Sequence, residues 1–132
     1  MLPELTLNTP QNTEVLAPSG IIKMIYNAQL DHLLALGQDR RVSFWSIPEK
    51  RVIKQLQASY EVEVNSFSLT TDGNLIVVGD ESGEVKVFTY NNCQLVHIEN
   101  VHSSGVSAIG VSPDNTLIIT ADDLGHMFFW RI

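Results

Sequence analysis

The side chains in this sequence that could carry out chemistry are few and scattered. The four histidines, at positions 32, 97, 102 and 126, have no cysteine or paired glutamate at the spacing that zinc sites use. Two acid pairs, Asp80-Glu81 and Asp122-Asp123, could in principle exchange protons with a substrate. Both pairs stand in the same kind of turn, so we expect them to shape that turn. We therefore predict no catalytic, metal-binding or cofactor-binding residues.

The remaining nucleophiles do not stand in a catalytic setting either. Cys93 is the only cysteine, so it cannot form an internal disulfide, and we interpret it as a small residue near a strand end. Ser103 and Ser104 lie next to His102, but no strained turn of the hydrolase type surrounds them. No glycine-rich loop for phosphate is present. An enzyme is thus only a formal alternative to a binding protein.

Bulk properties fit one folded domain. The chain has 132 residues, of which 44% are hydrophobic, enough for a packed core. The net charge of −7 disfavours nucleic acid and anionic membranes as partners, because phosphate binding needs clustered Lys and Arg. We find no apolar run of the roughly 20 residues that a membrane helix needs. The N-terminus does not read as a secretory signal, so we expect an intracellular protein.

A motif that ends in an aromatic residue occurs three times at a near-constant interval. Its last residues are Trp45, Phe88 and Trp130, separated by 43 and 42 positions. Two sets of apolar residues keep a step of 42: Ile22, Val64 and Val106, and Leu33, Leu75 and Leu117. A period of this length is typical of repeat architectures, which usually serve as binding platforms.

Each repeat reads as a small sheet. A first strand, a turn, a short apolar strand and the aromatic-ending strand follow one another, as in 64–69, 75–78 and 82–88 of the second unit. A more polar fourth strand is predicted at 51–56 and 94–98, with Lys54 and His97 facing water. No helical periodicity is sustained. The fold class is therefore all-β, with four-stranded antiparallel sheets that stack radially as β-propeller blades.

The repeats divide the chain into three blades, at about 20–58, 59–100 and 101–132, after an N-terminal segment 1–19. Since a closed propeller has roughly four to eight blades, three blades make an incomplete ring. We expect the last blade to lack its outer strand, and segment 14–17 to supply the outer strand of a preceding blade. Two interpretations remain open: the chain is the C-terminal part of a larger propeller, or it pairs with another chain.

The third unit resembles WD40 repeats most closely. His102, the strand 106–111 with its Ser112-Pro-Asp-Asn turn, and Trp130 match the family pattern. In that family a His, a Ser or Thr, an Asp and a Trp form a buried hydrogen-bonded lock. Carried over, the resemblance implies the residues His102, Thr120, Asp123 and Trp130, and in the first unit Asp39 and Trp45. Asp123 lies one position before the family's acid, where this chain has Leu124.

The other two units depart from that pattern. The first has Ala35 at the hydroxyl position, and the second has Val78 there, with Ser82 at the acid position and Phe88 at the aromatic one. We therefore expect the first two blades to be held by apolar packing.

A narrower resemblance concerns cilia- and flagella-associated WD-repeat proteins. The segments Gln38–Trp45, Ser82–Asn91 and Leu95–His97, followed by His102-Ser-Ser-Gly105, look like the last blades of that family. The resemblance implies a structural component inside the doublet microtubules of the axoneme, bound to tubulin and neighbouring inner proteins. The alternative is a cytoplasmic WD40 adaptor that recruits a peptide or a regulatory protein.

Loops at the rims of a propeller are the places where partners usually bind. The residues that we predict to contact a protein partner are Arg40 and Arg41, in a turn on one rim, and Tyr60, Glu61, Glu63, Ser103 and Ser104, before first strands on the other rim.

Overall fold

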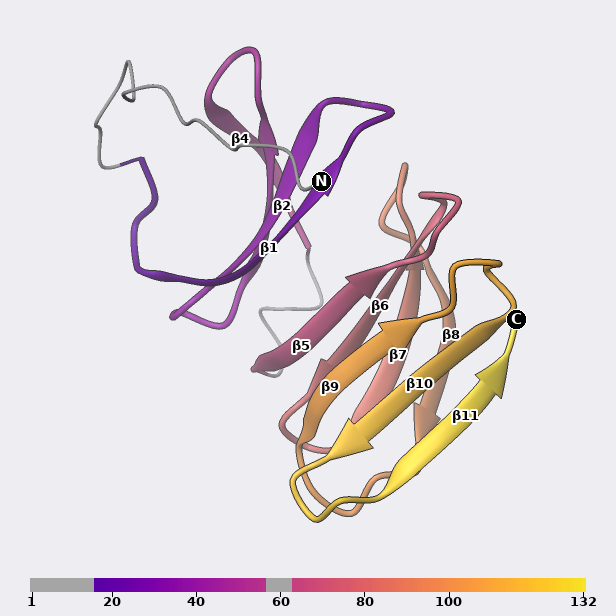
Figure 1. Ribbon diagram of the computed structural model, residues 1–132. Coiled ribbons are helices and arrows are strands. Elements are labelled where there is room, and N and C mark those ends of the chain that lie inside the picture. Colours follow the sequence, from indigo (N-terminus) through magenta and orange to yellow (C-terminus); the bar gives the residue numbers. More distant parts are fainter. Residues whose placement is uncertain (1–15, 57–62) are drawn as a thin grey trace, which may run out of the picture.

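The computed structural model describes residues 16–56 and 63–132, and within these ranges the chain is built from strands without a helix. In these two ranges, eleven strands form three antiparallel sheets that lie one after another along the chain (Figure 1). We call each sheet a blade. The all-β fold class with an open ring of three propeller blades is thereby confirmed.

The blades differ in strand number. Blade 1 contains β1 (Ile21–Asn27), β2 (His32–Gly37), β3 (Val42–Ser46) and β4 (Arg51–Gln55). Blade 2 contains β5 (Val64–Leu69), β6 (Leu75–Asp80), β7 (Glu84–Thr89) and β8 (Leu95–Asn100). Blade 3 contains β9 (Val106–Val111), β10 (Leu117–Asp122) and β11 (Met127–Arg131). In the described residues the third sheet therefore ends at its third strand.

Tight turns between the first two strands of each blade depend on left-handed backbone positions. Asp31, at φ 53°, and Asn115, at φ 62°, take such conformations, which Asp and Asn tolerate better than other residues with a side chain. In blade 3 the Asp114 carboxylate also accepts the Thr116 amide at 3.2 Å. These turns reverse the chain within a few residues, so the strands pair as a meander.

The main hydrophobic core lies between blades 1 and 2. Phe44 is fully buried, and its ring meets the Tyr90 ring edge-on with the centroids 5.3 Å apart. The other buried residues of this cluster come from both blades: Leu34, Leu36, Val42, Leu56, Val64, Phe67, Ile76, Val78 and Phe88. The hydrophobic contact between the two sheets thus stabilises both of them.

Blades 2 and 3 pack more closely at their first strands, where β5 and β9 lie side by side (Figure 1). A smaller cluster of Val77, Val85, Val106 and Ile118 fills this junction. A Cβ atom at Gly79 would collide with the side chain of Val106, so the absence of a side chain on β6 permits the approach. Where the two sheets come nearest, only glycine fits.

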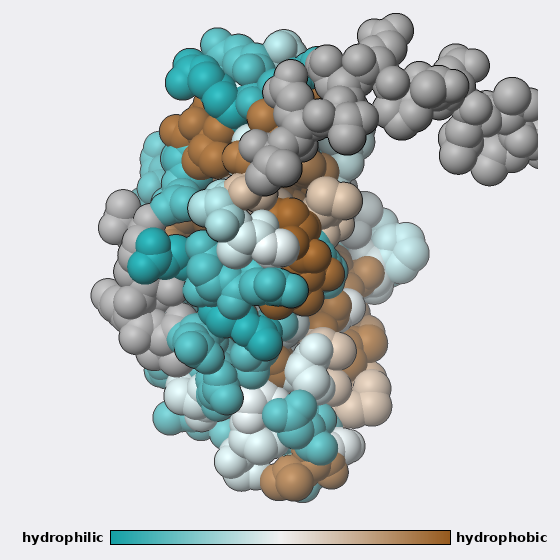
Figure 2. All heavy atoms as spheres, turned by 90° about the vertical axis from the view of Figure 1, so that its left-hand side faces the viewer, coloured by the Kyte–Doolittle hydropathy of each residue, from teal (hydrophilic) through white to brown (hydrophobic). Residues whose placement is uncertain are grey.

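Both ends of the row of blades leave apolar faces exposed. On blade 1, Met24 is 59% and Tyr26 56% exposed; on blade 3, Met127 is 57% and Phe129 64% exposed. Figure 2, seen from the side of blade 1, shows hydrophobic residues at the surface next to hydrophilic ones. The equivalent faces between the blades are buried. The end faces are therefore surfaces of the kind that another sheet covers.

Candidate functional site

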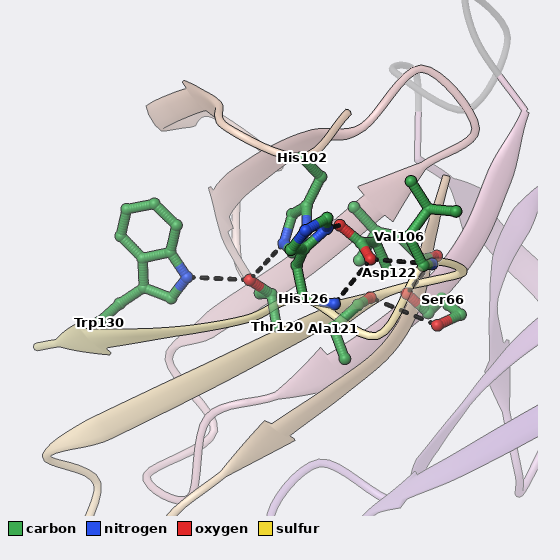
Figure 3. Close-up of polar contacts among 10 residues, drawn as sticks. Ser66, His102, Val106, Thr120, Ala121, Asp122, His126 and Trp130 are labelled. Atoms are coloured by element: carbon green, nitrogen blue, oxygen red, sulfur yellow. Dashed lines mark hydrogen bonds and ion pairs between the residues drawn. The ribbon is translucent and has the colours of Figure 1, made fainter. Parts of the chain in front are cut away.

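A buried hydrogen-bonded network ties the loop before β9 to the other strands of blade 3. The His102 ring contacts the Thr120 hydroxyl through Nε2 at 2.7 Å and the Asp122 carboxylate through Nδ1 at 2.9 Å. The Trp130 indole donates to the same Thr120 hydroxyl at 3.0 Å. Figure 3 shows the four side chains meeting between β10, β11 and the loop. We call His102, Thr120, Asp122 and Trp130 the blade-3 lock.

The donors and acceptors of the lock form one continuous chain. Because Asp122 can only accept when it is ionised, His102 carries its proton on Nδ1 and leaves Nε2 as an acceptor. The Thr120 hydroxyl then donates to Nε2 and accepts from Trp130. Every polar group of the blade-3 lock has a partner, and such a fully satisfied buried network makes the arrangement of strands specific.

The acid of the lock is Asp122, so the assignment of Asp123 was wrong. Strand β10 ends at Asp122, and alternation along the strand directs Thr120 and Asp122 to the same face. Asp123 is exposed in the following turn, where its backbone amide donates to the Gly105 carbonyl at 3.2 Å. The structure thus places three of the four implied residues, His102, Thr120 and Trp130, in the network.

Asp122 also organises the turn that follows it. One carboxylate oxygen accepts the backbone amides of Leu124 and His126, each at 3.0 Å, and the other lies 3.2 Å from Nδ1 of the His126 ring. Burial acts to raise the pKa of Asp122, but the hydrogen bonds from His102, from these two amides and from the His126 ring outweigh it and lower the pKa to about 2. The carboxylate is therefore ionised at neutral pH.

Blade 2 retains the acid without the rest of the lock. Asp80, at the end of β6, accepts the backbone amides of Ser82 at 2.9 Å and Glu84 at 3.1 Å, as Asp122 does in blade 3. The prediction that Ser82 replaces the acid is therefore wrong: Ser82 donates its hydroxyl to Asp80. Val78 stands at the hydroxyl position and is buried in the core. Asp80 shapes a turn here and does not hold a histidine among the described residues.

In blade 1 the predicted lock residues Asp39 and Trp45 lie apart from any such network among the described residues. Asp39 accepts the backbone amide of Arg41 at 3.2 Å. A Cβ atom at Gly37, the position equivalent to Asp80, would lie only 2.6 Å from an Asp39 carboxylate oxygen, so Asp39 occupies the space of the missing acid. Trp45 is half-buried and lines a shallow groove with Leu16.

Lysines link blade 1 to blade 2, which the sequence did not indicate. Lys54 donates to the carbonyl oxygens of Tyr90 at 2.9 Å and Asn91 at 3.1 Å, and its ammonium group lies 4.6 Å from the centre of the Phe44 ring. Lys23 donates to the Phe67 carbonyl at 2.8 Å. The prediction that Lys54 faces water was wrong. The turn between β7 and β8, which contains Tyr90 and Asn91, lies within reach of the long Lys54 side chain.

One rim of the three blades carries a polar depression. Arg40 from blade 1, Asn65 and Glu81 from blade 2, and Ser107 and Asp123 from blade 3 line a hollow of about 340 Å³. Proximity to Glu63, through a hydrogen bond and like charge, raises the pKa of Glu81. We call these residues, with Glu63, the rim surface.

The predicted contact residues that the structure describes lie on this one rim, which corrects the expectation of two. The Arg40 carbonyl accepts the Val64 amide at 3.4 Å, so the β2–β3 turn adjoins the start of β5. In an antiparallel meander the loop before the first strand and the turn after the second strand lie at the same end. Arg41, Glu63 and Ser103 are exposed there.

Two other predicted contacts, Tyr60 and Glu61, lie outside the described residues. The Ser104 hydroxyl is buried without a hydrogen-bond partner in the described part of the chain, so Ser104 is not an open contact group. Within residues 16–56 and 63–132, no group of three or more His, Cys, Asp or Glu side chains is placed to hold a metal ion. No helix in the same ranges is long and apolar enough to cross a membrane.

Comparison with known proteins agrees with this architecture. The model of the anaphase-promoting complex subunit 4 WD40 domain matches residues 24–119, which is more than half of the chain. The chain belongs to the WD40-repeat family. Its blades superpose on the WD40 repeats of RRP9 with a TM-score of 0.77 at 14% identity, covering 88% of this chain and 36% of that one. At that identity the likeness concerns the fold alone.

Two relatives indicate a more specific group of WD40 proteins. Cilia- and flagella-associated protein 52 of Mus musculus is 26% identical over 121 residues, which cover 92% of this chain and 20% of that protein. The protein of that name from Chlamydomonas reinhardtii is 27% identical over 120 residues, covering 91% of this chain and 20% of the relative. The chain thus spans about 20% of the length of these relatives and is a WD40 scaffold-type protein homologous to them.

Proposed function

We propose that this WD40 chain is part of a non-catalytic scaffold in cilia or flagella, where it binds tubulin and neighbouring proteins inside the doublet microtubules. The observation that carries the proposal is the similarity to cilia- and flagella-associated protein 52 along 92% of the chain. The exposed apolar end faces add physical support, since further blades or a second chain would cover them.

The rim surface is the part of the scaffold that we assign to partner contact. Arg40 stands within a hollow that also contains the carboxylates Glu81 and Asp123, so both signs of charge are presented from three blades. Such mixed charge favours a protein surface with complementary charges over a uniformly anionic ligand. The net charge of −7 makes nucleic acid and anionic membrane poor partners.

Localisation in ciliated cells tests the cellular role. The tagged protein should enter the axoneme and remain there after detergent and high salt, because a component inside the microtubule wall is shielded from extraction. This retention of the fusion should be lost in cells whose axonemes are depolymerised. A cytoplasmic adaptor, the alternative function, would wash out with detergent, and that result would exclude the scaffold.

A charge-reversal experiment tests the rim surface separately. The variant R40E/R41E/E63K should lose axonemal retention while circular dichroism shows that it remains folded. The control reverses the exposed Glu49–Arg51 ion pair, whose atoms are 3.0 Å apart, in the turn at the opposite end of blade 1. Equal retention of both variants would contradict the assignment of this rim.

A further inference from the structure

The two interfaces between neighbouring blades are built differently. Between blades 2 and 3, β5 and β9 lie side by side, and the Val106 side chain occupies the space next to Gly79. The Ser66 hydroxyl donates to the Val106 carbonyl at 3.3 Å, so a short side chain is enough to cross this interface. Such close approach of two main chains leaves the sheets little room to move relative to each other.

Between blades 1 and 2 the first strands, β1 and β5, stand further apart. Arg40 and Gly83 have positive φ in equivalent turns, and four positions before them stand Leu36 in blade 1 and Gly79 in blade 2. Leu36 is fully buried in the shared core. Because its side chain fills the space that Gly79 leaves open, β5 does not approach blade 1 as β9 approaches blade 2.

A long side chain crosses this wider interface. Lys23 pairs with Leu36 as Ser66 pairs with Gly79, so Lys23 and Ser66 hold equivalent places on the first strands. The Lys23 ammonium group donates to the Phe67 carbonyl at 2.8 Å. The lysine stem is flexible and the core beside it is held by non-directional apolar contact. Both kinds of contact can persist while the two blades shift.

The turns on the rim opposite the rim surface repeat the contrast. Asn115, in the β9–β10 turn, accepts the Thr71 amide and donates to the Asp72 carboxylate, each at 3.0 Å. The Thr71 hydroxyl donates to the Ser112 carbonyl at 2.8 Å. We call Thr71, Asp72, Ser112 and Asn115 the turn clasp, because these directional contacts fix the turn of blade 2 to the turn of blade 3.

The corresponding turns of blades 1 and 2 touch without a clasp. Gly73 has positive φ at the place that Asn115 holds in blade 3, with values of 76° and 62°. A Cβ atom at Gly73 would lie 3.1 Å from Oε1 of Gln29 in the β1–β2 turn. Within residues 16–56 and 63–132 no hydrogen bond joins these two turns, since glycine has no side chain to offer.

We propose that the interface between blades 1 and 2 is a hinge, at which blade 1 moves as one body against the fixed pair of blades 2 and 3. The backbone contact across it, from the Val64 amide to the Arg40 carbonyl, is long at 3.4 Å. Arg40 lines the hollow of the rim surface from blade 1, whereas Glu81 and Asp123 line it from blades 2 and 3. Opening of the hinge therefore separates Arg40 from the two carboxylates and widens the hollow.

Distances between pairs of spin labels test the hinge in the full 132-residue chain. In a Cys93→Ser background, Ile53→Cys, Leu95→Cys and Met127→Cys place labels at exposed positions of blades 1, 2 and 3. The distance distribution between positions 53 and 95 should be at least about twofold wider than that between positions 95 and 127. Circular dichroism shows whether each labelled chain is folded. Equal widths would overturn the proposal.

Transfer of the clasp locates the hinge. G73N gives blade 2 the residue that blade 3 has at position 115, in a backbone conformation that Asn tolerates, and should narrow the distribution between positions 53 and 95. The control G125N makes the same change at a glycine with positive φ whose added Cβ meets nothing within 4 Å, and should have no effect. N115G removes the clasp and should widen the distribution between positions 95 and 127.

Amide hydrogen exchange of unlabelled chains measures the same motion without labels. Exchange in β1, which faces the hinge, should be slower in G73N than in G125N, because the added side chain holds the β1–β2 turn against blade 2. The same exchange in G73N and G125N, or an unchanged distribution between positions 95 and 127 in N115G, would overturn the proposal.

Discussion

Blade 3 and the junction between blades 1 and 2 are stabilised by different kinds of interaction. In blade 3, four side chains of one sheet and its preceding loop form a satisfied hydrogen-bonded network. Between blades 1 and 2, the fully buried residues Phe44 and Phe67 belong to a core shared by two sheets. The network acts within one blade, whereas the core acts only while two blades are in contact.

The difference shows how a repeat can lose its polar lock and persist. Where Val78 replaces the hydroxyl of Thr120, the side chain joins the hydrophobic core, so apolar burial takes over from hydrogen bonding. As a consequence, the stability of blade 1 depends on its contact with blade 2. We expect substitutions at the junction to affect both blades, and substitutions in the lock to affect blade 3 first.

The largest effect is expected at the shared core. Phe44→Ala removes a fully buried ring that contacts Tyr90 and should lower the free energy of unfolding by about 3–5 kcal/mol. Urea unfolding of the full chain measures the loss, with Ile53→Ala, at an exposed position of β4, as the control. A loss below 1 kcal/mol would mean that the two blades are not stabilised through this core.

The second-largest effect is expected when the central hydroxyl of the lock is removed. Thr120→Val keeps the shape of the side chain but leaves Nε2 of His102 and Nε1 of Trp130 without their partner, for a loss of roughly 2–3 kcal/mol. Thr120→Ser retains the hydroxyl and should lose much less. In a Trp45→Phe background the remaining fluorescence reports on blade 3, where the change should appear. An unchanged Trp130 transition would contradict the local action of the lock.

Acid should weaken blade 3 through Asp122. Its pKa is lowered from 3.8 to about 2 in the folded chain, so its ionised form stabilises the fold above pH 3.8 and this contribution disappears as the pH falls to about 2. The Trp130 signal should therefore respond to acid in that interval. In Asp122→Asn the response between these pH values should be clearly smaller. An unchanged acid response in that variant would assign the effect to other carboxylates.

A smaller effect is expected from the lysine that joins blades 1 and 2. Lys54→Met keeps the apolar stem but removes the donor to the Tyr90 and Asn91 carbonyls, which should lower the free energy of unfolding by about 1–2 kcal/mol. Arg51→Met, which breaks an exposed ion pair with Glu49, should change it by less than about 1 kcal/mol. If both variants lose the same amount, Lys54 contributes no more than a surface charge.

The sequence repeat made the fold predictable. It did not make predictable which aspartate of the third repeat is the acid of the lock. Both Asp80 and Asp122 stand three residues before a glycine with positive φ, Gly83 at 94° and Gly125 at 88°. Alignment on these glycines would have selected Asp122, whereas the family's acid position fell on Leu124 and led to its neighbour Asp123. A Cβ at Gly83 would collide with the His102 carbonyl oxygen, which shows why this position is constrained.

Contacts between blades could not be predicted from single repeats. Lys54 and the carbonyl of Tyr90 are 36 residues apart, and only the placement of blade 2 beside blade 1 brings them together. The two-rim expectation failed for a related reason, because strand direction decides which loops share an end. The periodicity of the sequence thus predicted the blades themselves, whereas only the structure showed how they are arranged relative to one another.

The smallest effect is expected on the rim surface, outside both the lock and the core. Hydrogen bonding and like charge from Glu63 raise the pKa of Glu81 above 4.5, so the ionised pair destabilises the folded chain at neutral pH. Glu63→Gln should therefore increase stability slightly above that pKa and leave it unchanged at lower pH, where Glu81 is protonated. Thermal unfolding of the wild type and of Glu63→Gln, each at pH 7 and at pH 4, measures this difference. Glu49→Gln, on the opposite rim, is the control. A gain of equal size at both pH values would show that the charge of Glu63 is not its cause, and a loss at pH 7 would mean that Glu63 supports the rim.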